Sequence, residues 1–346
     1  MSKFILNVEF SADFNANSKA KMDVTHFLNQ ESYTTISVPY LQGKDKLKIR
    51  QTISAITKKL VPGDILFIQY PTYLGFVINE LLLSWCQRHG VKTIGLMHDL
   101  EAVRLHFPAY KFWKSLKAEV HRLNKFNYVI PSNDDMGNFL EENGMKTPWS
   151  GLGIFDYYHE EQLPNNDPQL RNVVNFAGNL KKSKFISPLT HTNFKTGFRF
   201  FGVKNDDLNF PKNMKYAGIF PPEKLIDELK NGYGLVWDGS SIETCDGLLG
   251  NYLKFNNPHK TSLYLSAGMP VVIWKEAALG KFVEENKVGV LVSSLTELDA
   301  KLSEISEKQY IEMQMNAQNL SKKLTSGFYV KSAARKALNF LEKEVD

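Results

Sequence analysis

The sequence is poor in cysteine. Only Cys86 and Cys245 occur among the 346 residues, far apart and without the spacing of a metal site around either. Disulfide frameworks and structural zinc sites need several cysteines at short spacings, so both are excluded. This composition fits a reducing compartment, and we expect a cytoplasmic protein.

Long apolar runs are also absent. No segment approaches the roughly 20 apolar residues that a bilayer-spanning helix needs. The first ten residues contain one positive charge and a short apolar run that Asn7 and Glu9 interrupt, which is not the pattern of a secretory signal. We therefore expect no transmembrane segment and no export by that route.

Charge of neither sign dominates. The chain has 42 Lys and Arg against 37 Asp and Glu, a net charge of +5, and the basic residues are scattered. Proteins that bind nucleic acids usually have clustered basic residues. We therefore expect no nucleic-acid partner.

Several catalytic motifs are missing. The sequence contains no Gly-x-x-x-x-Gly-Lys-[Ser/Thr] loop, no Gly-x-Gly-x-x-Gly after a strand, no His-Glu-x-x-His and no Gly-x-Ser-x-Gly. These absences argue against ordinary nucleotide triphosphatases, plain dinucleotide-binding enzymes, zinc peptidases and serine hydrolases. Asp-x-Asp is missing too, so divalent-metal phosphate chemistry has no obvious set of ligands, and we expect no metal. We expect no other cofactor.

The length and the alternation of apolar and amphipathic segments predict two α/β domains. In the first half we predict helices between short buried strands. The predicted strands are Phe4–Val8, Thr34–Val38, Asp64–Gln69, Val91–Met97 and Tyr128–Pro131. The predicted helices are Lys19–Asn29, Lys46–Leu60, Gly75–Arg88, Ala109–Lys125 and Asp134–Asn143.

The second half repeats this alternation. Strands are predicted near Asn172–Ala177, Phe198–Gly202, Tyr233–Trp237, Met269–Ile273 and Val288–Leu291. Helices are predicted near Pro222–Lys230, Pro258–Ala267 and Leu279–Asn286, and from Glu304 to the end with a break at Ser326–Gly327. We predict an N-terminal domain over 1–156, a linker over 157–170, a C-terminal domain over 171–325, and a final helix over 326–346 that packs back on the N-terminal domain.

Alternating strands and helices form parallel sheets covered on both faces. Two such domains facing each other make a central cleft, and ligands of open parallel sheets bind beyond the carboxyl ends of the strands. The turns that follow strands are therefore the candidate sites.

The strongest candidate is the segment from Asn256 to Val272. Asn257 suits a helix N-cap, Pro258 the first helical position, and Gly268 a left-handed stop. The amides of residues 259–261 and the Lys260 ammonium then form an anion site suited to phosphate. The alternative is that Lys260 only solvates a helix end.

Two further turns follow strands of the second domain. Gly178 lets the backbone approach a ligand closely, and Lys181 and Lys182 add positive charge; the alternative is an ordinary turn with solvated lysines. Asp238 begins a polar loop whose hydroxyls and carboxylates suit sugar recognition, although a plain surface loop explains it equally. The loop residues that we assign to the donor sugar are Ser240, Thr244, Cys245 and Asp246.

In the first domain, His98 and Asp99 follow a predicted strand. A His-Asp pair at a strand end suits a general base and its orienting partner, and a structural hydrogen bond is the alternative. Asp13, in the turn after the first strand, is the remaining candidate base.

These segments together resemble the bacterial glucosyltransferase 3-like family of GT-B glycosyltransferases, which act in O-glycosylation of serine-rich adhesins, with relatives in surface polysaccharide assembly. The resemblance covers nearly the whole chain. It rests on the following segments: His98–Glu101, Leu152–Tyr157, Phe176–Lys182, Tyr216 with Pro221–Leu225, Gly232–Asp238 and Lys260–Val272.

The resemblance implies UDP on the C-terminal domain, a sugar acceptor on the N-terminal domain, and no metal. It places Lys260 and the backbone after it at the diphosphate, and Gly178, Asn179 and Tyr216 near the nucleotide. The full set of predicted nucleotide-binding residues is Gly178, Asn179, Lys182, Tyr216, Asp238, Asn257, Lys260, Thr261 and Ser262. Relatives have Arg where this chain has Lys182. We also expect a homo-oligomer, a dimer or tetramer.

We therefore predict a UDP-sugar-dependent hexosyltransferase. The predicted reaction moves glucose or N-acetylglucosamine to a sugar hydroxyl on an already GlcNAc-modified serine-rich adhesin glycoprotein. The alternatives are a UDP-sugar epimerase or hydrolase on the same fold, and a non-catalytic partner subunit of an adhesin glycosyltransferase complex. Lys260 argues against the last, because a chain that no longer binds nucleotide has no need of an anion site.

Overall fold

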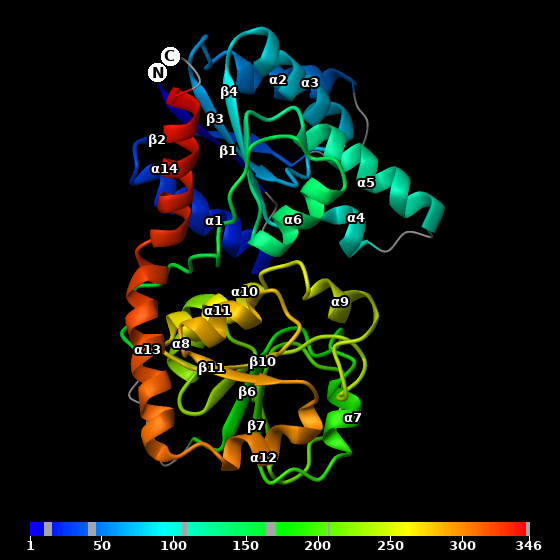
Figure 1. The fold of residues 1–346 in the computed structure, drawn as a ribbon, viewed down its shortest axis with the longest axis vertical. Coiled ribbons are helices and arrows are strands. Elements are labelled where there is room, and N and C mark those ends of the chain that lie inside the picture. The colour runs from blue at the N-terminus through cyan, green and yellow to red at the C-terminus, as the bar shows by residue number, and fades with distance from the viewer. Residues whose placement is uncertain (10–15, 41–45, 106–108, 164–170, 207, 344–346) are drawn as a thin grey trace. The chain divides into compact units, whose positions relative to one another are not determined.

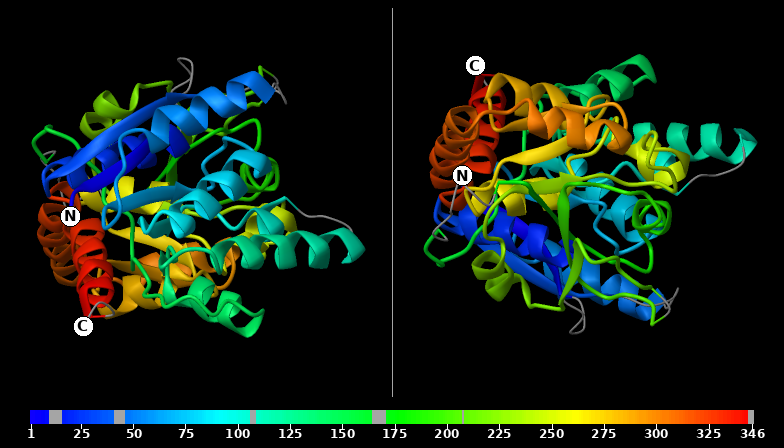
Figure 2. Two further views of the ribbon diagram at one scale, coloured as in Figure 1. Left: turned by 90° about the horizontal axis from the view of Figure 1, so that it is seen from above. Right: turned by 90° about the horizontal axis from the view of Figure 1, so that it is seen from below.

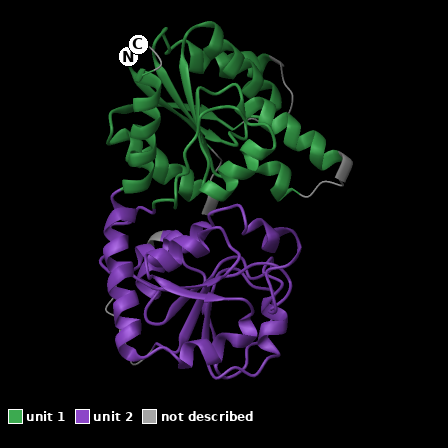
Figure 3. Cartoon of the chain, viewed as in Figure 1, with its two compact units in different colours: residues 1–156, 327–346 green, residues 157–326 purple. Residues whose placement is uncertain are grey.

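The protein folds into two compact units (Figure 3). The structure is a computed structural model that describes residues 1–9, 16–40, 46–105, 109–163, 171–206 and 208–343. The first unit contains Met1–Asp156 and Gly327–Asp346, and the second contains Tyr157–Ser326. The chain thus leaves the first unit after Asp156 and returns to it after Ser326.

The first unit contains a parallel sheet with the strand order β2-β1-β3-β4-β5 (Figure 1). Its strands are β1 (Lys3–Glu9), β2 (Tyr33–Pro39), β3 (Ile65–Tyr70), β4 (Lys92–Met97) and β5 (Tyr128–Ile130). Its helices are α1 (Ala16–Asn29), α2 (Lys46–Thr57), α3 (Phe76–Arg88), α4 (Glu101–Arg104), α5 (Ala109–Leu123), α6 (Asp134–Glu142) and α14 (Phe328–Lys343). Every residue of β3 is buried, as expected of a central strand covered on both faces.

The second unit contains a six-stranded parallel sheet with the order β11-β10-β9-β6-β7-β8. Its strands are β6 (Val173–Ala177), β7 (Gly197–Phe201), β8 (Met214–Gly218), β9 (Tyr233–Val236), β10 (Val271–Trp274) and β11 (Gly289–Val292). Its helices are α7 (Ile186–Thr190), α8 (Pro222–Glu228), α9 (Gly247–Tyr252), α10 (His259–Ser266), α11 (Leu279–Glu285), α12 (Leu298–Ser303) and α13 (Glu307–Thr325). The short 3-10 helix Leu295–Glu297 precedes α12.

The predicted strands and helices are confirmed, with ends that differ by a few residues. The strand β8 and the short helices α4, α7, α9 and α12 were not predicted. The predicted start of one helix was wrong. Pro258 was predicted as the first helical residue, but it is the N-cap of α10, and the helix begins at His259. The reason is that Pro258 has an extended ψ of 123°, so its own backbone lies outside the helix.

The C-terminal helix α14 belongs to the first unit, and its N-terminus is capped by a residue far away in the chain. Gly327, which precedes it, has φ 74°, and a Cβ there would lie 2.3 Å from the ring of Phe27. Glycine is therefore required at this position, and it offers no capping side chain. The Asp156 carboxylate instead accepts from the amides of Tyr329 at 3.1 Å and Val330 at 2.7 Å.

This cap predicts a pH-dependent stability. Burial raises the pKa of Asp156 to about 7, although the two amide donors oppose that shift. An unfolded aspartate titrates near about 3.9, so between these values the native state holds a proton that the unfolded state lacks. The stability contributed by the carboxyl is therefore greatest below about pH 4 and falls as the pH rises to about 7. Denaturation of the parent and of Asp156→Asn should show the parent losing stability relative to the variant from pH 5 to 8. Glu307→Gln, at an exposed position, should show no such trend, and a constant difference for Asp156→Asn would contradict the assignment.

Candidate functional site

Helix α10 is held against the sheet of the second unit by Tyr264. The hydroxyl of Tyr264 accepts from the Ala177 amide at 2.7 Å, at the end of β6. The ring of Tyr264 occupies the space beside Gly234 of β9, where a Cβ would lie 2.1 Å from the ring. The start of α10 is thereby placed at the carboxyl ends of two central strands.

Lys260, in the first turn of α10, extends over these strand ends. Its Nζ lies 3.3 Å from the Trp237 carbonyl oxygen and 4.6 Å from the centre of the Phe176 ring. Burial lowers the pKa of Lys260, while the nearby Asp238 carboxylate opposes that shift. Within the described residues, the long contact to Trp237 is the one hydrogen bond recorded for this ammonium, so N–H groups remain for an anion.

Two hydroxyls next to Lys260 also have no hydrogen-bond partner among the described residues. Thr261 and Ser262 are 0 % and 1 % exposed, and neither hydroxyl has a hydrogen-bond partner in the described part of the chain. Unpaired buried polar groups are rare and costly. One expectation is corrected: the Thr261 amide already donates to the Pro258 carbonyl at 2.9 Å, because the helix begins one residue later than predicted.

The turn after β6 is held by backbone hydrogen bonds within the turn and to the end of β7. The Asn179 carbonyl accepts from the amides of Lys182 at 3.0 Å and Ser183 at 3.2 Å, and the Gly178 amide donates to Phe201 at 2.9 Å. The close backbone approach lies at Gly202, where a Cβ would come within 1.8 Å of the Gly178 carbonyl oxygen. Gly202 was not predicted from the sequence, and its φ of 127° also requires glycine.

Tyr216 lies on β8, at the edge of this sheet. Its hydroxyl donates to the Gly202 carbonyl at 3.0 Å, which places it beside the turn after β7. Its ring is parallel to that of Phe210 at 6.3 Å, and the Lys204 ammonium lies 5.5 Å from the ring centre. The side chain is 37 % exposed, so part of the ring is open to a ligand.

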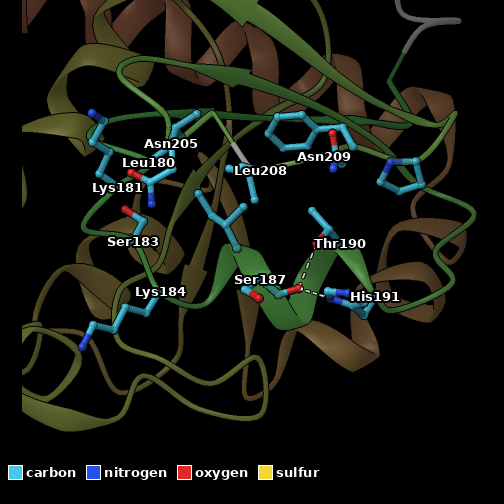
Figure 4. A pocket seen from close by; sticks show the side chains of 13 residues that line it. Leu180, Lys181, Ser183, Lys184, Ser187, Thr190, His191, Asn205, Leu208 and Asn209 are labelled. Carbon is cyan, nitrogen blue, oxygen red and sulfur yellow. Dashed lines mark hydrogen bonds between the residues drawn. The ribbon is translucent and has the colours of Figure 1, made fainter.

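A hollow of about 650 Å³ adjoins the turn after β6 (Figure 4). Side chains of α7 line one side, and Asn205, Leu208 and Asn209 line the other. Thr190 and His191 both bond to the Ser187 carbonyl, at 2.8 and 2.7 Å. Its lining includes none of the predicted nucleotide-binding residues, so this hollow and the Lys260 site are different places.

The loop after β9 is closed by its own carboxylate. Asp246 accepts from the amides of Ser240 at 2.6 Å and Ser241 at 3.1 Å and from the Ser240 hydroxyl at 2.9 Å. These donors lower the pKa of Asp246. Cys245 is 1 % exposed, and burial raises the pKa of its thiol to about 12. Thr244 is exposed. Of the four predicted residues, Asp246, Ser240 and Cys245 thus shape the loop, and Thr244 is exposed.

In the first unit, His98 and Asp99 follow β4 as predicted. His98 is 6 % exposed, with Nε2 at 2.8 Å from Gln69 Oε1 and its ring stacked on Phe155 at 4.9 Å. Asp99 accepts from Arg104 at 2.7 Å. Their role as base stays a prediction, and Asp13 lies outside the described residues.

Sequence analysis missed the buried Lys21 of α1, which lies close to Asp99. Lys21 is 7 % exposed; its ammonium donates to the Pro71 carbonyl and lies 4.4 Å from the centre of the Tyr73 ring. Burial lowers the pKa of Lys21 to about 7, while Asp99 and Glu101 oppose that shift. A lysine in an otherwise ordinary amphipathic helix has no sequence signal that marks it as buried.

Within the described ranges, no three His, Cys, Asp or Glu side chains are grouped in a way that could hold a metal ion. None of the described helices is long and apolar enough to span a membrane.

Comparison with known proteins defines the class first. The chain covers 99 % of sucrose-phosphate synthase from Thermosynechococcus elongatus and is itself covered to 99 %, with a TM-score of 0.65 at 11 % identity. The fold is therefore GT-B, with two Rossmann-like domains.

Sequence matches then define the family. Residues 2–154 match the glucosyltransferase 3-like N-terminal domain and residues 174–337 the corresponding C-terminal domain, so this chain belongs to the glucosyltransferase 3-like family. It is 29 % identical to the beta-1,6-galactofuranosyltransferase WbbI of Escherichia coli over 98 % of this chain and 99 % of the relative. It is 24 % identical to glucosyltransferase 3 of Streptococcus gordonii over 90 % of this chain and 91 % of that protein.

The contact between Gly234 and Tyr264 predicts the effect of one added methyl group. Gly234→Ala should displace the ring and destabilise the protein by about 1–3 kcal/mol, as overpacked cores do. Gly197→Ala is the matched control, because its Cβ meets its neighbours at 3.6 Å or more. Chemical denaturation measures both, and equal stabilities of the two variants would show that α10 is not held this way.

Proposed function

We propose that the protein transfers a hexosyl group from a UDP-sugar to a sugar hydroxyl. The Lys260 ammonium is the observation that carries this proposal, because its N–H groups remain available at the start of a helix and at the carboxyl ends of β6 and β9. The helix dipole and a fixed cation stabilise negative charge on a departing diphosphate without a metal. Tyr216 and the turn at Gly178 and Asn179 are the proposed nucleotide contacts beside it.

The proposed donors are UDP-glucose and UDP-N-acetylglucosamine, and the proposed acceptor is a GlcNAc-modified serine-rich glycoprotein. The similarity to glucosyltransferase 3 supports this choice. A second candidate is galactofuranosyl transfer to a saccharide, which the similarity to WbbI over nearly the whole of both chains favours.

Product analysis separates these functions. The purified protein is incubated with UDP-glucose, UDP-N-acetylglucosamine or UDP-galactofuranose and a GlcNAc-primed peptide or a saccharide acceptor. Mass spectrometry of the acceptor identifies transfer, and chromatography of the nucleotides identifies epimerisation or hydrolysis. A protein that binds UDP but changes neither acceptor nor donor would instead be a non-catalytic partner subunit.

Removal of the Lys260 ammonium tests the diphosphate site. Hydrogen bonds to charged groups contribute roughly 1.5–3 kcal/mol, so Lys260→Ala should weaken UDP binding by roughly ten- to a hundredfold. Lys254→Ala removes a lysine that pairs with Glu276 at 2.9 Å and should leave UDP binding unchanged. Calorimetric titration measures both, and parent-like binding by the Lys260 variant would place the diphosphate elsewhere.

Metal independence follows from the same chemistry. With a fixed cation in place of a divalent ion, transfer should persist in excess EDTA at the rate measured with Mg²⁺ or Mn²⁺. Activity that vanishes with EDTA and returns with Mn²⁺ would contradict this proposal. Nucleotide release, followed by chromatography, supplies the rate.

The loop from Ser240 to Gly247 is the proposed determinant of the donor sugar. Thr244 is exposed and has a hydroxyl to pair with the sugar, whereas Asp246 is already occupied in closing the loop. Thr244→Val should change the ratio of UDP-glucose to UDP-N-acetylglucosamine use more than it changes UDP affinity, because selectivity comes from polar groups that the wrong sugar leaves unpaired. Glu307→Gln, at an exposed position on α13 outside this loop, is the control. An unchanged ratio in Thr244→Val would exclude this residue from the site.

A further inference from the structure

The first unit contains a cavity of about 410 Å³ that sequence analysis did not anticipate. It lies beyond the carboxyl end of β3, where Tyr70 ends the strand, and is bounded by residues of α3, α4 and α5. Its volume lies in the range of about 300–1,000 Å³ that is usual for small-ligand sites. Figures 1 and 2 show α5 extending outward from the sheet of this unit.

Aromatic side chains form much of the wall. Phe76, at the start of α3, is 60 % exposed although the Arg122 guanidinium lies 4.8 Å from the centre of its ring. Tyr73 has φ 60°, a left-handed conformation that is rare for a bulky residue. Residues in strained backbone conformations are often found at ligand sites, where the surrounding structure holds them in that conformation. An exposed ring beside a cavity offers a face to the C–H side of a sugar.

The Arg122 guanidinium in this cavity already has hydrogen-bond partners. Arg122 donates to the Tyr70 hydroxyl at 2.6 Å and to Glu80 at 3.1 Å, and Lys125 also pairs with Glu80. The Glu119 carboxylate is likewise occupied, since it accepts from the amides of Glu101 at 3.2 Å and Ala102 at 2.9 Å. Arg122 and Glu119 are therefore both held by partners within the protein.

Glu101 differs from these residues. It lines the cavity, and no donor to its carboxylate is recorded among the residues that the structure describes. Burial raises the pKa of Glu101, while Arg104, Arg122 and Lys21 oppose that shift and Asp99 adds to it. A carboxylate only accepts hydrogen bonds, so it suits a ligand rich in hydroxyl donors and repels one that carries negative charge.

We propose that this cavity binds a neutral sugar residue of the acceptor, with one face of the sugar against Phe76 and a sugar hydroxyl donating to Glu101. This inference rests on the proposed function and adds the charge class of the acceptor: neutral sugars bind, and uronic acids or phosphorylated sugars are excluded.

Saturation-transfer NMR on the full chain, with UDP added to occupy the donor site, tests the inference. The probes are methyl β-D-glucopyranoside, methyl N-acetyl-β-D-glucosaminide and methyl β-D-glucuronide. The two neutral glycosides should bind, and Phe76→Ala and Glu101→Gln should each weaken them by roughly tenfold. Val77→Ala, on the same helix at an exposed position outside the cavity lining, should leave binding unchanged. The glucuronide should bind the parent at least roughly tenfold more weakly than the neutral sugars, and Glu101→Gln should narrow that difference.

No binding of neutral glycosides to the parent, equal binding by the parent and both variants, or equal binding of the glucuronide would each overturn the inference. Thermal denaturation shows whether each variant is folded. If either Phe76→Ala or Glu101→Gln does not fold, the other variant still tests the inference. A separate UDP titration reports on the second unit alone. A parent that binds glycosides but not UDP would overturn the donor site and leave this inference standing.

Discussion

The contact between Tyr264 and Gly234 is the constraint on which the candidate donor site depends. Because position 234 has no side chain, the ring can lie against β9 while its hydroxyl accepts from the last amide of β6. These two contacts fix the position of α10 along the strands and its orientation against the sheet. Lys260, one turn earlier, is thereby placed over Phe176 and beside the Trp237 carbonyl.

The backbone N–H groups at the helix starts of this protein find their hydrogen-bond acceptors in different ways. Asn133 and Ser306 cap α6 and α13 with their own side chains. Glu119 and Asp156 cap α4 and α14 from distant parts of the chain. Helix α10 has Pro258 as its N-cap and no side-chain cap. Its buried hydroxyls and the Lys260 ammonium are the groups that a bound anion would satisfy.

The two units present different chemistry at corresponding places. Beyond the strand ends of the second unit lie a cation and a helix start, which suit a diphosphate. Beyond β3 of the first unit lie aromatic rings and a carboxylate, which suit hydroxyl-rich, uncharged molecules. The proposed transfer of a sugar from a nucleotide to a glycan needs both kinds of site, one for charge and one for hydroxyls.

The amino-acid sequence by itself determined the α/β class, nearly all strands, most helices and the segment around Lys260. Hydrophobic periodicity, turn residues and helix-capping preferences depend on a few neighbouring residues, so they can be read from the sequence alone. The edge strand β8 was not predicted because only Met214 of its five residues is buried, which weakens the apolar signal of a strand.

Only the tertiary structure decided which polar groups are occupied and which remain available. Asp246 and Lys260 were both candidates for ligand contacts from the sequence, yet the first closes its own loop while the second keeps free N–H groups. Lys21, Glu101 and Arg122 come from three helices and meet near β3 only when the chain folds. The physical reason is that burial, pairing and pKa depend on neighbours distant in the chain, and local sequence patterns do not record those neighbours.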